Sequence, residues 1–388
     1  MTRRSIVIAA GGTAGHVVPA LAVADALRAD GHRVVFIGGD REEARLVPEA
    51  GFELHRLRVQ GLSRTNPLKA ARAAGQAGRA VCTARRILRD VAPDAVMGGG
   101  GYVAGVGGAA AASLRIPLVL TEADSHLGVS NRLLHRRAAR VCLGFPIEGR
   151  DEPTFRVTGR PVPPPDRDRA GARAAFGLAD DVPTVLVFGG SLGARSVNEA
   201  AVEGLADLLV PGPPGPRRVA VLHATGRRDH ADLARRFPDR VAEAPAAARA
   251  GSVGPAATVG PTVEYRLYDY LAPLSRALAA CDLVVARSGG SIAEVTAHGR
   301  PAVLVPYPHA AADHQTANAR WMEREGAAIV VADDALTAEG LRTTVADLLG
   351  DHDRLGAMAA ASAALARPDA ARTIADEVLA AAGADRVA

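Results

Sequence analysis

IVIAAGGTAGHVVPALAVADAL, residues 6–27, contains an apolar strand, a glycine-rich turn and an alanine-rich helix in direct succession. This order is typical of the first βαβ unit of a Rossmann-like domain. The glycines let a ligand approach the backbone closely, and the helix N-terminus offers unpaired N–H groups and a partial positive charge. His16 lies where the helix begins, so we expect it to face a ligand site. A capping or solvated imidazole is an equally good interpretation of this stretch alone.

Two further stretches repeat this order. VLVFGGSLGARSVNEAAVEGL, residues 185–205, again contains a strand, a glycine turn and a helix, and GGGGYVAGVGG, residues 98–108, follows an apolar strand. Short β-branched segments alternate with longer alanine- and leucine-rich ones, which is typical of βαβ units around a parallel sheet. We therefore predict an α/β protein with two doubly wound, Rossmann-like domains.

The proline-rich stretch VTGRPVPPPDRDRAGAR, residues 157–173, is typical of a linker because charges follow its prolines. A chain of 388 residues also exceeds the usual size of a single core. We predict an N-terminal domain over residues 1–163 and a C-terminal domain over residues 164–388. Ligands bind beyond the carboxyl ends of parallel strands, so the glycine turns of both domains are expected to face a shared cleft.

The composition narrows the class of protein. The chain has 46 Lys and Arg against 42 Asp and Glu, a net charge of +4. This excess suits an anionic ligand or membrane surface and is too small to indicate nucleic acid. The three cysteines have no metal-binding spacing, so we expect buried thiols in a reducing compartment. The apolar segments are too short or too interrupted for a signal peptide or a membrane span, so we expect a soluble cytoplasmic protein.

Polar residues cluster after one strand of the first half. LVLTEADSHLGVSNRLL, residues 118–134, places Glu122, Asp124, His126 and Asn131 where catalytic loops occur. A capping cluster for the helix that begins near Ser130 is an equally good interpretation.

Two polar stretches of the second half suit a nucleotide sugar. They are a strand-to-helix turn, ARSGGSIAEV, and the hexapeptide DHQTAN, and their candidate residues are Ser288, Gly290, Ser291, Glu294, His314 and Gln315. A carboxylate at Glu294 can accept two hydrogen bonds from the vicinal hydroxyls of a ribose. The alternative is a small favourable interaction with the helix dipole.

The sequence lacks the motifs of several nucleotide and metal sites. No glycine cluster matches G-x-G-x-x-G or a P-loop, no D-x-D lies between apolar runs, and no H-x-x-x-H is present. We therefore expect no metal and no cofactor, with a diphosphate held by helix N-termini, Arg195 and Arg287. A nicotinamide enzyme stays a formal alternative because Asp40 follows the second strand, but the glycine fingerprint is missing.

A basic segment, SRTNPLKAARAAGQAGRAVCTARRILRD, covers residues 63–90 and has a weakly apolar face. Such a segment can lie on anionic lipid. A solvated surface helix is the commoner explanation of a charge run of this kind.

Together these motifs resemble one family closely, the MurG enzymes of peptidoglycan synthesis and hence of cell wall biogenesis, cell shape and cell division. The resemblance spans nearly the whole chain. It rests on the order of GGTAGHVVPALAVA, GGYVAGVGG, GGSLGARSVN and ARSGGSIAEVTAHGRPAVLVPYPHAAADHQTANA.

The resemblance implies an activity and a fold. The activity is inverting transfer of N-acetylglucosamine from UDP-N-acetylglucosamine to undecaprenyl-pyrophosphoryl-muramoyl-pentapeptide, without a required metal. The fold is GT-B, two Rossmann-like domains facing a cleft, in which the last helix, here RPDAARTIADEVLAAAG, often crosses back to the first domain. A polyprenyl acceptor makes the basic segment a membrane-docking surface, so we expect a peripheral protein on the cytoplasmic face of the cell membrane.

The resemblance also implies site residues. Ser191 and Gly193 would hold the diphosphate, Glu294 the ribose, Leu271 the uracil, and His314 and Gln315 the donor sugar. Thr13, Gly15, His16 and Tyr102 of the first two glycine loops would face the acceptor, with Asn198 at the cleft.

Some residues depart from the family pattern. The family commonly has H-E-Q-N where this chain has TEAD, so Glu122 matches, Asp124 replaces Asn, and His126 is a stand-in for the missing histidine. The family's G-N-P-V-R is GRPVP here, with Arg160 near the position of the lost arginine. These changes concern substrate contacts rather than the reaction class.

We expect His16 to be the general base, because a neutral imidazole has a suitable pKa, with Glu122 and then His126 as alternatives. Two other functions stay open from the sequence. They are a related GT-B transferase for another lipid or a natural product, and a non-catalytic UDP-sugar-binding protein.

Overall fold

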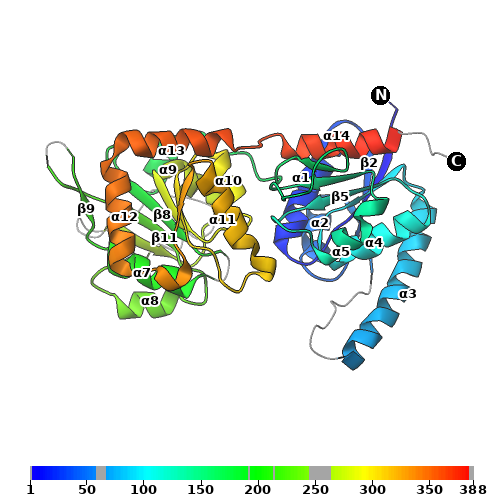
Figure 1. Cartoon of the computed structure of the whole chain (residues 1–388), viewed down its shortest axis with the longest axis horizontal. Coiled ribbons are helices and arrows are strands. Elements are labelled where there is room, and N and C mark those ends of the chain that lie inside the picture. Colours follow the sequence, from blue (N-terminus) through cyan, green and yellow to red (C-terminus); the bar gives the residue numbers. More distant parts are fainter. Residues whose placement is uncertain (1, 58–66, 191–192, 213–214, 244–263, 384–388) are drawn as a thin grey trace. The chain divides into compact units, whose positions relative to one another are not determined.

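The computed structural model describes residues 2–57, 67–190, 193–212, 215–243 and 264–383, with backbone only for residues 67–77. It divides into two compact units, which are Met1–Val162 with Arg367–Ala388, and Pro163–Ala366. The chain passes from one unit to the other within the proline cluster. Figure 1 shows a parallel sheet with helices on it in each unit.

The first unit is built on a parallel sheet with strand order β3-β2-β1-β4-β5-β6-β7. Its strands are β1 (Ser5–Ala9), β2 (Arg33–Gly38), β3 (Glu53–Arg56), β4 (Ala95–Gly98), β5 (Leu118–Glu122), β6 (Arg140–Leu143) and β7 (Phe155–Val157). Its helices are α1 (Ala14–Ala29), α2 (Glu43–Glu49), α3 (Pro67–Val91), α4 (Gly101–Ser113), α5 (Val129–Leu134) and α14 (Ala370–Gly383), with a short 3₁₀ turn, η1 (His135–Arg137).

Helices cover both faces of this sheet. In β1, Ile6 and Ile8 pack into one cluster with α1 and α14, whereas Val7 and Ala9 pack into another with α3 and α4. Alternate residues of a strand point to opposite faces, so a sheet that is covered on both sides needs apolar residues at every position. This explains why the strand reads as a continuous apolar run.

The last helix, α14, belongs to the first unit although it ends the chain. Ile374 and Val378 lie buried in the α1 cluster. Glu377 forms ion pairs with Arg140 on β6, at 2.9 Å, and with Arg156 on β7. The carboxylate of Glu377 therefore ties the helix to the edge of the sheet.

The second unit has a parallel sheet with strand order β12-β13-β11-β8-β14-β15-β16. These strands are β8 (Thr184–Phe188), β11 (Ala220–Ala224), β12 (Ala242–Glu243), β13 (Tyr265–Tyr268), β14 (Leu283–Ala286), β15 (Ala302–Leu304) and β16 (Ala328–Val330), and β9 (Leu209–Val210) pairs with β10 (Arg217–Arg218) in a small antiparallel ribbon. Its helices are α6 (Arg169–Ala175), α7 (Arg195–Leu205), α8 (His230–Arg236), α9 (Leu274–Ala280), α10 (Ile292–Ala297), α11 (His314–Arg324), α12 (Ala338–Gly350) and α13 (His352–Ala364), with 3₁₀ turns η3 (Ala311–Asp313) and η4 (Asp333–Ala335).

Both sheets confirm the predicted α/β, doubly wound class. One cysteine differs from its prediction, because Cys82 is exposed on α3 while Cys142 and Cys281 are buried. Within the described residues, we find no helix with the length and apolar character that a membrane crossing requires.

Candidate functional site

The candidate residues of the first unit lie at the carboxyl edge of its sheet. Strand β1 leads to His16, β4 to Tyr102, and β5 ends at Glu122. These three strands are neighbours, with β4 between β1 and β5. Their adjacency brings together loops that are about a hundred residues apart in the sequence, at the point of a doubly wound sheet where ligands bind.

His16 lies in the first turn of α1, behind an exposed turn formed by Thr13 and Gly15. Its imidazole packs against Gly100, where a Cβ would lie only 2.6 Å from Nδ1. This Nδ1 is buried and has no hydrogen-bond partner in the described part of the chain. Burial lowers the pKa of His16, the Arg160 guanidinium lowers it further, and Asp124 opposes both. The ring is therefore neutral at neutral pH, as a base must be.

Glu122 is a buried carboxylate that organises the loop after β5. Its Oε2 accepts hydrogen bonds from the backbone N–H of Gly128, at 2.7 Å, and from Nδ2 of Asn131, at 2.9 Å. Its Oε1 accepts a longer one, 3.4 Å, from the N–H of Asp124. Burial raises the pKa of Glu122 and these hydrogen bonds counteract the rise. These hydrogen bonds close the loop from Asp124 to Gly128, which also contains His126. Glu122 therefore holds the loop that carries two other candidates, Asp124 and His126.

Arg160 connects the two loops that carry His16 and Glu122. Its guanidinium donates to the carbonyl of Gly15, at 2.8 Å, and to the carbonyl of Ala123, at 3.1 Å. The residue follows β7, so the bridge is made from a third point of the same edge. A single side chain thus supplies both a positive charge beside His16 and a link between the loops.

Glu43 is a residue that sequence reasoning missed. It lies in the first turn of α2, is 1% exposed, and accepts hydrogen bonds of 2.8 Å from the N–H groups of Gly12 and Gly39. It therefore fixes the first glycine turn from behind. The available signal was an acid at the start of a helix, four residues after Gly39, which follows the end of β2.

A small cavity of about 20 Å³ gathers several of these residues, since Gly15, His16, Glu122 and Arg160 all line it. Tyr102 is not among its lining residues. It lies half-buried in the first turn of α4, where burial raises the pKa of its hydroxyl.

The second unit also places its candidates at the carboxyl edge of a sheet. Ser191 lies outside the described residues, whereas Gly193 has φ +79° and packs so closely that a Cβ would lie 2.0 Å from the carbonyl oxygen of Thr225. Arg195 begins α7 with an exposed side chain, 3.9 Å from Asp229. A helix N-terminus with an exposed guanidinium beside it suits an anionic ligand.

Asn198 was expected to lie at the cleft as a ligand contact, but its side chain is bonded within the protein. It is completely buried, and its Nδ2 donates to the carbonyl of Thr225, at 2.9 Å, and to Asp229, at 3.2 Å. Its Oδ1 is bonded to His223, at 3.0 Å. With both ends of the amide occupied by the protein, it supports the neighbouring loops rather than touching a ligand.

Arg287 and Ser288 are likewise used inside the protein. Arg287 forms a 2.6 Å ion pair with Asp333 and donates to the carbonyls of Val305 and Pro306, so the prediction that it neutralises a diphosphate is wrong. Ser288 is fully buried and donates its hydroxyl to the carbonyl of Gln315, at 2.7 Å.

The remaining candidates lie around α10 and α11. Gly290 and Ser291 form the turn before α10, with Glu294, half-buried, in its first turn. Gln315 accepts a 3.0 Å hydrogen bond from the N–H of Tyr307, and His314 bonds the carbonyl of Ala311. Leu271, 7% exposed, follows β13.

The turn before α11 has an unusual backbone. Ala312 and Asp313 are consecutive residues with φ of +52°. A left-handed conformation of this kind costs a residue with a Cβ about 1 kcal/mol, and such conformations cluster at ligand sites. The backbone at the candidate sugar-binding turn is therefore held in place by its surroundings.

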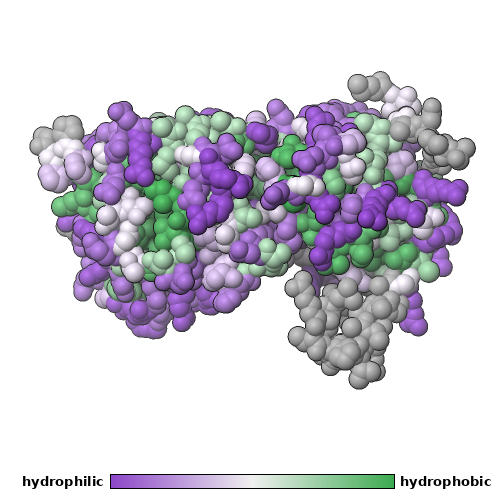
Figure 2. All heavy atoms as spheres, in the orientation of Figure 1, coloured by the Kyte–Doolittle hydropathy of each residue, from purple (hydrophilic) through white to green (hydrophobic). Residues whose placement is uncertain are grey.

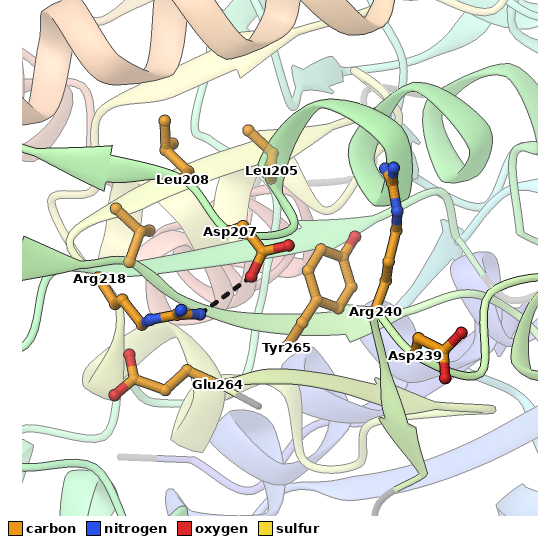
Figure 3. Close-up of a pocket in the computed structure, with 9 residues that line it drawn as sticks. Leu205, Asp207, Leu208, Arg218, Asp239, Arg240, Glu264 and Tyr265 are labelled. Carbon is orange, nitrogen blue, oxygen red and sulfur yellow. Dashed lines mark hydrogen bonds and ion pairs between the residues drawn. The ribbon is translucent and has the colours of Figure 1, made fainter. Parts of the chain in front are cut away.

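A second cavity, about 200 Å³, lies away from these residues (Figure 3). It is at the amino ends of β11 and β13, the edge opposite to the one that carries Gly193 and Arg195. Arg218 and Asp207 pair at 2.9 Å in its wall, beside the ring of Tyr265. None of the predicted site residues lines it.

The similarity to known proteins covers nearly the whole chain. Residues 6–143 match the glycosyltransferase family 28 N-terminal domain, and residues 184–374 match the glycosyltransferase family 28 C-terminal domain. Several relatives bear the name UDP-N-acetylglucosamine--N-acetylmuramyl-(pentapeptide) pyrophosphoryl-undecaprenol N-acetylglucosamine transferase. The one from Moorella thermoacetica is 40% identical over 96% of this chain and 98% of its own, and the one from Salinibacter ruber is 39% identical over 97% and 96%.

Solved structures agree with the sequence comparison. MurG of Acinetobacter baumannii matches with a TM-score of 0.75 and 29% identity, over 98% of this chain and all of that one. The calicheamicin glycosyltransferase CalG4 matches with a TM-score of 0.65 and 20% identity, over 99% of each, which concerns the fold alone. These matches confirm the GT-B fold, and with the full-length relatives they show that the chain belongs to the MurG family of glycosyltransferases.

Proposed function

We propose that this protein transfers N-acetylglucosamine from UDP-N-acetylglucosamine to the muramoyl sugar of undecaprenyl-pyrophosphoryl-muramoyl-pentapeptide. The observation that carries the proposal is 40% identity to a transferase of that name over 96% of the chain. The two carboxyl edges are chemically suited to it, because one offers a neutral imidazole and the other a glycine turn at a helix N-terminus.

The second unit binds the donor. The N-terminus of α7, with Ser191, Gly193 and Arg195, holds the diphosphate, and Glu294 accepts hydrogen bonds from the ribose hydroxyls. Leu271 lies beside the uracil, and Gly290, Ser291, His314 and Gln315 surround the sugar, with the Ser288 hydroxyl holding Gln315. Charge accumulates on the diphosphate as UDP leaves, so preorganised N–H donors and Arg195 stabilise the transition state.

The first unit binds the acceptor and accepts its proton. The glycine loops with Thr13, Gly15 and Tyr102 face the acceptor, and Asp124 and His126 lie in the loop that Glu122 holds. His16 removes the proton of the attacking hydroxyl as that oxygen bonds to the anomeric carbon and the bond to UDP breaks. The attack from the opposite side inverts the anomeric centre.

Burial, with a further contribution from the charge of Arg160, lowers the pKa of His16 and so sets the pH range in which it works. Protonation inactivates a base, so kcat/KM is expected to fall as the pH falls through the pKa of His16, with a midpoint below 6.5. Arg160→Met removes a cation that lowers this pKa, and the midpoint should move to higher pH. Arg160→Lys keeps the charge but loses the two-carbonyl bridge, so kcat should fall while the midpoint stays. The pH dependence of kcat/KM for the wild type, Arg160→Met and Arg160→Lys tests this assignment. An unmoved midpoint in Arg160→Met would exclude His16 as the titrating group.

The acceptor's lipid requires the enzyme to work at a membrane surface, on its cytoplasmic face. One surface of the first unit supports this location. On α5, Val129 and Leu133 are 49% and 76% exposed. The same unit has exposed arginines on α5, η1 and α3, namely Arg132, Arg136, Arg137, Arg79, Arg86 and Arg89. Figure 2 shows hydrophobic and hydrophilic residues side by side over α4 and α5. Apolar side chains among cations suit an anionic bilayer.

Binding to vesicles tests this surface. Wild-type protein should bind phosphatidylglycerol vesicles in low salt, and less in high salt because the charges are screened. Leu133→Ser should weaken binding, whereas Leu209→Ser, which removes a leucine that is 50% exposed in the second unit, should not. Equal binding of both variants would assign the membrane contact to another surface.

Product analysis tests the reaction itself. Mass spectrometry of the lipid fraction should show one added N-acetylhexosamine, and NMR should show a β linkage to the muramoyl sugar. Transfer to a different lipid or to a natural product, with the muramoyl lipid unused, would contradict the assigned acceptor.

A further inference from the structure

Three buried side chains form a hydrogen-bonded row behind the donor edge of the second unit. They are Tyr265 on β13, His223 on β11 and Asn198 on α7, with exposures of 3%, 0% and 0%. The Tyr265 hydroxyl lies 2.9 Å from His223 Nδ1, and His223 Nε2 lies 3.0 Å from Asn198 Oδ1. Only Asn198 was singled out from the sequence, and as a ligand contact.

The direction of each hydrogen bond follows from the last residue. Asn198 Nδ2 donates to the Thr225 carbonyl and to the Asp229 carboxylate, so its Oδ1 is an acceptor. His223 Nε2 therefore carries the hydrogen, and Nδ1 accepts from the Tyr265 hydroxyl. Complete burial lowers the pKa of His223 to about 3, which keeps this tautomer neutral throughout the working pH range. The directions of the hydrogen bonds in this row therefore do not change with pH over that range.

The row ends at the loops that flank the diphosphate site. The carbonyl of Thr225, which Asn198 holds, is the atom against which Gly193 packs. Asp229 in turn accepts two hydrogen bonds from Arg228, at 2.8 and 3.0 Å, and lies 3.9 Å from Arg195. The position of Asn198 thus determines where Gly193 packs against Thr225. It also determines where the Asp229 carboxylate meets Arg195 and Arg228.

We propose that Tyr265 and His223, acting through Asn198, are positioning residues for the diphosphate of the donor. The proposal rests on the assignment of this edge to UDP-N-acetylglucosamine. Neither Tyr265 nor His223 touches the ligand. Tyr265 lies at the start of β13, beside the second cavity (Figure 3), so its hydroxyl acts on the donor edge only through the row.

Calorimetric titration with UDP tests the proposal on the full-length protein. Tyr265→Phe removes one oxygen and leaves Nδ1 without its donor, so His223 can turn and release Asn198. We expect the Kd for UDP to rise about tenfold, since small misplacements of binding groups have effects of this order or larger. The KM for UDP-N-acetylglucosamine should rise in parallel, and the KM for the lipid acceptor should stay unchanged.

Tyr268→Phe is the matched control. Tyr268 is on the same strand, is 2% exposed, and has its hydroxyl beside Arg266, outside the row. It removes an equally buried hydroxyl and should leave the Kd for UDP unchanged. Equal effects of the two variants on the Kd would mean general destabilisation of the sheet and would overturn the proposal.

If Tyr265→Phe is poorly folded, a second pair of variants tests the proposal instead. In His223→Gln the side-chain amide can still donate to Asn198 Oδ1, whereas His223→Leu leaves that oxygen unpaired in the core. UDP affinity should be retained in the first and lost in the second, and equal affinity in both would contradict the row. A wild-type protein that fails to bind UDP would instead overturn the assigned donor site.

Discussion

His16→Ala is expected to lower kcat about 10³-fold, since a positioned general base contributes roughly 10²–10⁴-fold. The KM for UDP-N-acetylglucosamine should change little, because His16 belongs to the first unit and the donor residues belong to the second. The imidazole is neutral through burial and the Arg160 charge, and its surroundings at Gly100 fix its orientation. Steady-state kinetics with both substrates varied would measure the effect.

His32→Ala serves as the control for loss of a buried imidazole. His32 is 7% exposed, and its Nδ1 accepts a hydrogen bond from the N–H of Arg4, at the opposite edge of the sheet. It should lower the melting temperature without lowering kcat. If His16→Ala kept kcat within a few-fold of wild type, the base would be Glu122, whose raised pKa also suits proton transfer.

Glu377→Ala is expected to lower the free energy of unfolding by about 2 kcal/mol, because it removes the charged hydrogen bonds that a buried carboxylate accepts from Arg140 and Arg156, while Arg140 keeps its ion pair with Glu152. The Glu377 side chain is 9% exposed and pairs with Arg140 and Arg156. These pairs join the end of the chain to β6 and β7, so their loss loosens α14 from the sheet. Urea denaturation would measure the change.

Asp376→Ala is its matched control. Asp376 is the preceding residue of α14, is 57% exposed, and pairs only locally with Arg372 among the contacts described. Exposed pairs contribute about 0.2–1 kcal/mol, so this variant should stay close to wild type. Equal stability of the two variants would mean that α14 is held by its apolar face alone.

The fold could be predicted from the sequence because its signals are local. The apolar run of β1, the glycines after it and the helix that follows lie within about twenty-five residues, and the same order recurs at β8 and α7. Each signal identifies a βαβ unit without knowledge of any distant contact. The polar loop after β5 was predictable for the same reason.

The side chains that fix the site could not be predicted in this way. Glu43 reaches a glycine turn 31 residues earlier in the chain, and Glu377 reaches Arg140 across 237 residues. The sequence shows a polar residue at such positions but gives no indication of its partner. Asn198 and Arg287 were predicted to contact a ligand because their loops suit one. Both side chains are buried instead, Asn198 bonded to Thr225 and His223, and Arg287 paired with Asp333.

Release of UDP from UDP-N-acetylglucosamine, with and without the undecaprenyl-linked muramoyl-pentapeptide and in the presence of EDTA, tests the proposed transfer most directly. We predict release that depends on the acceptor and persists in EDTA, with one UDP formed for each sugar transferred. Binding of UDP-N-acetylglucosamine without release on addition of that acceptor would contradict the proposed reaction.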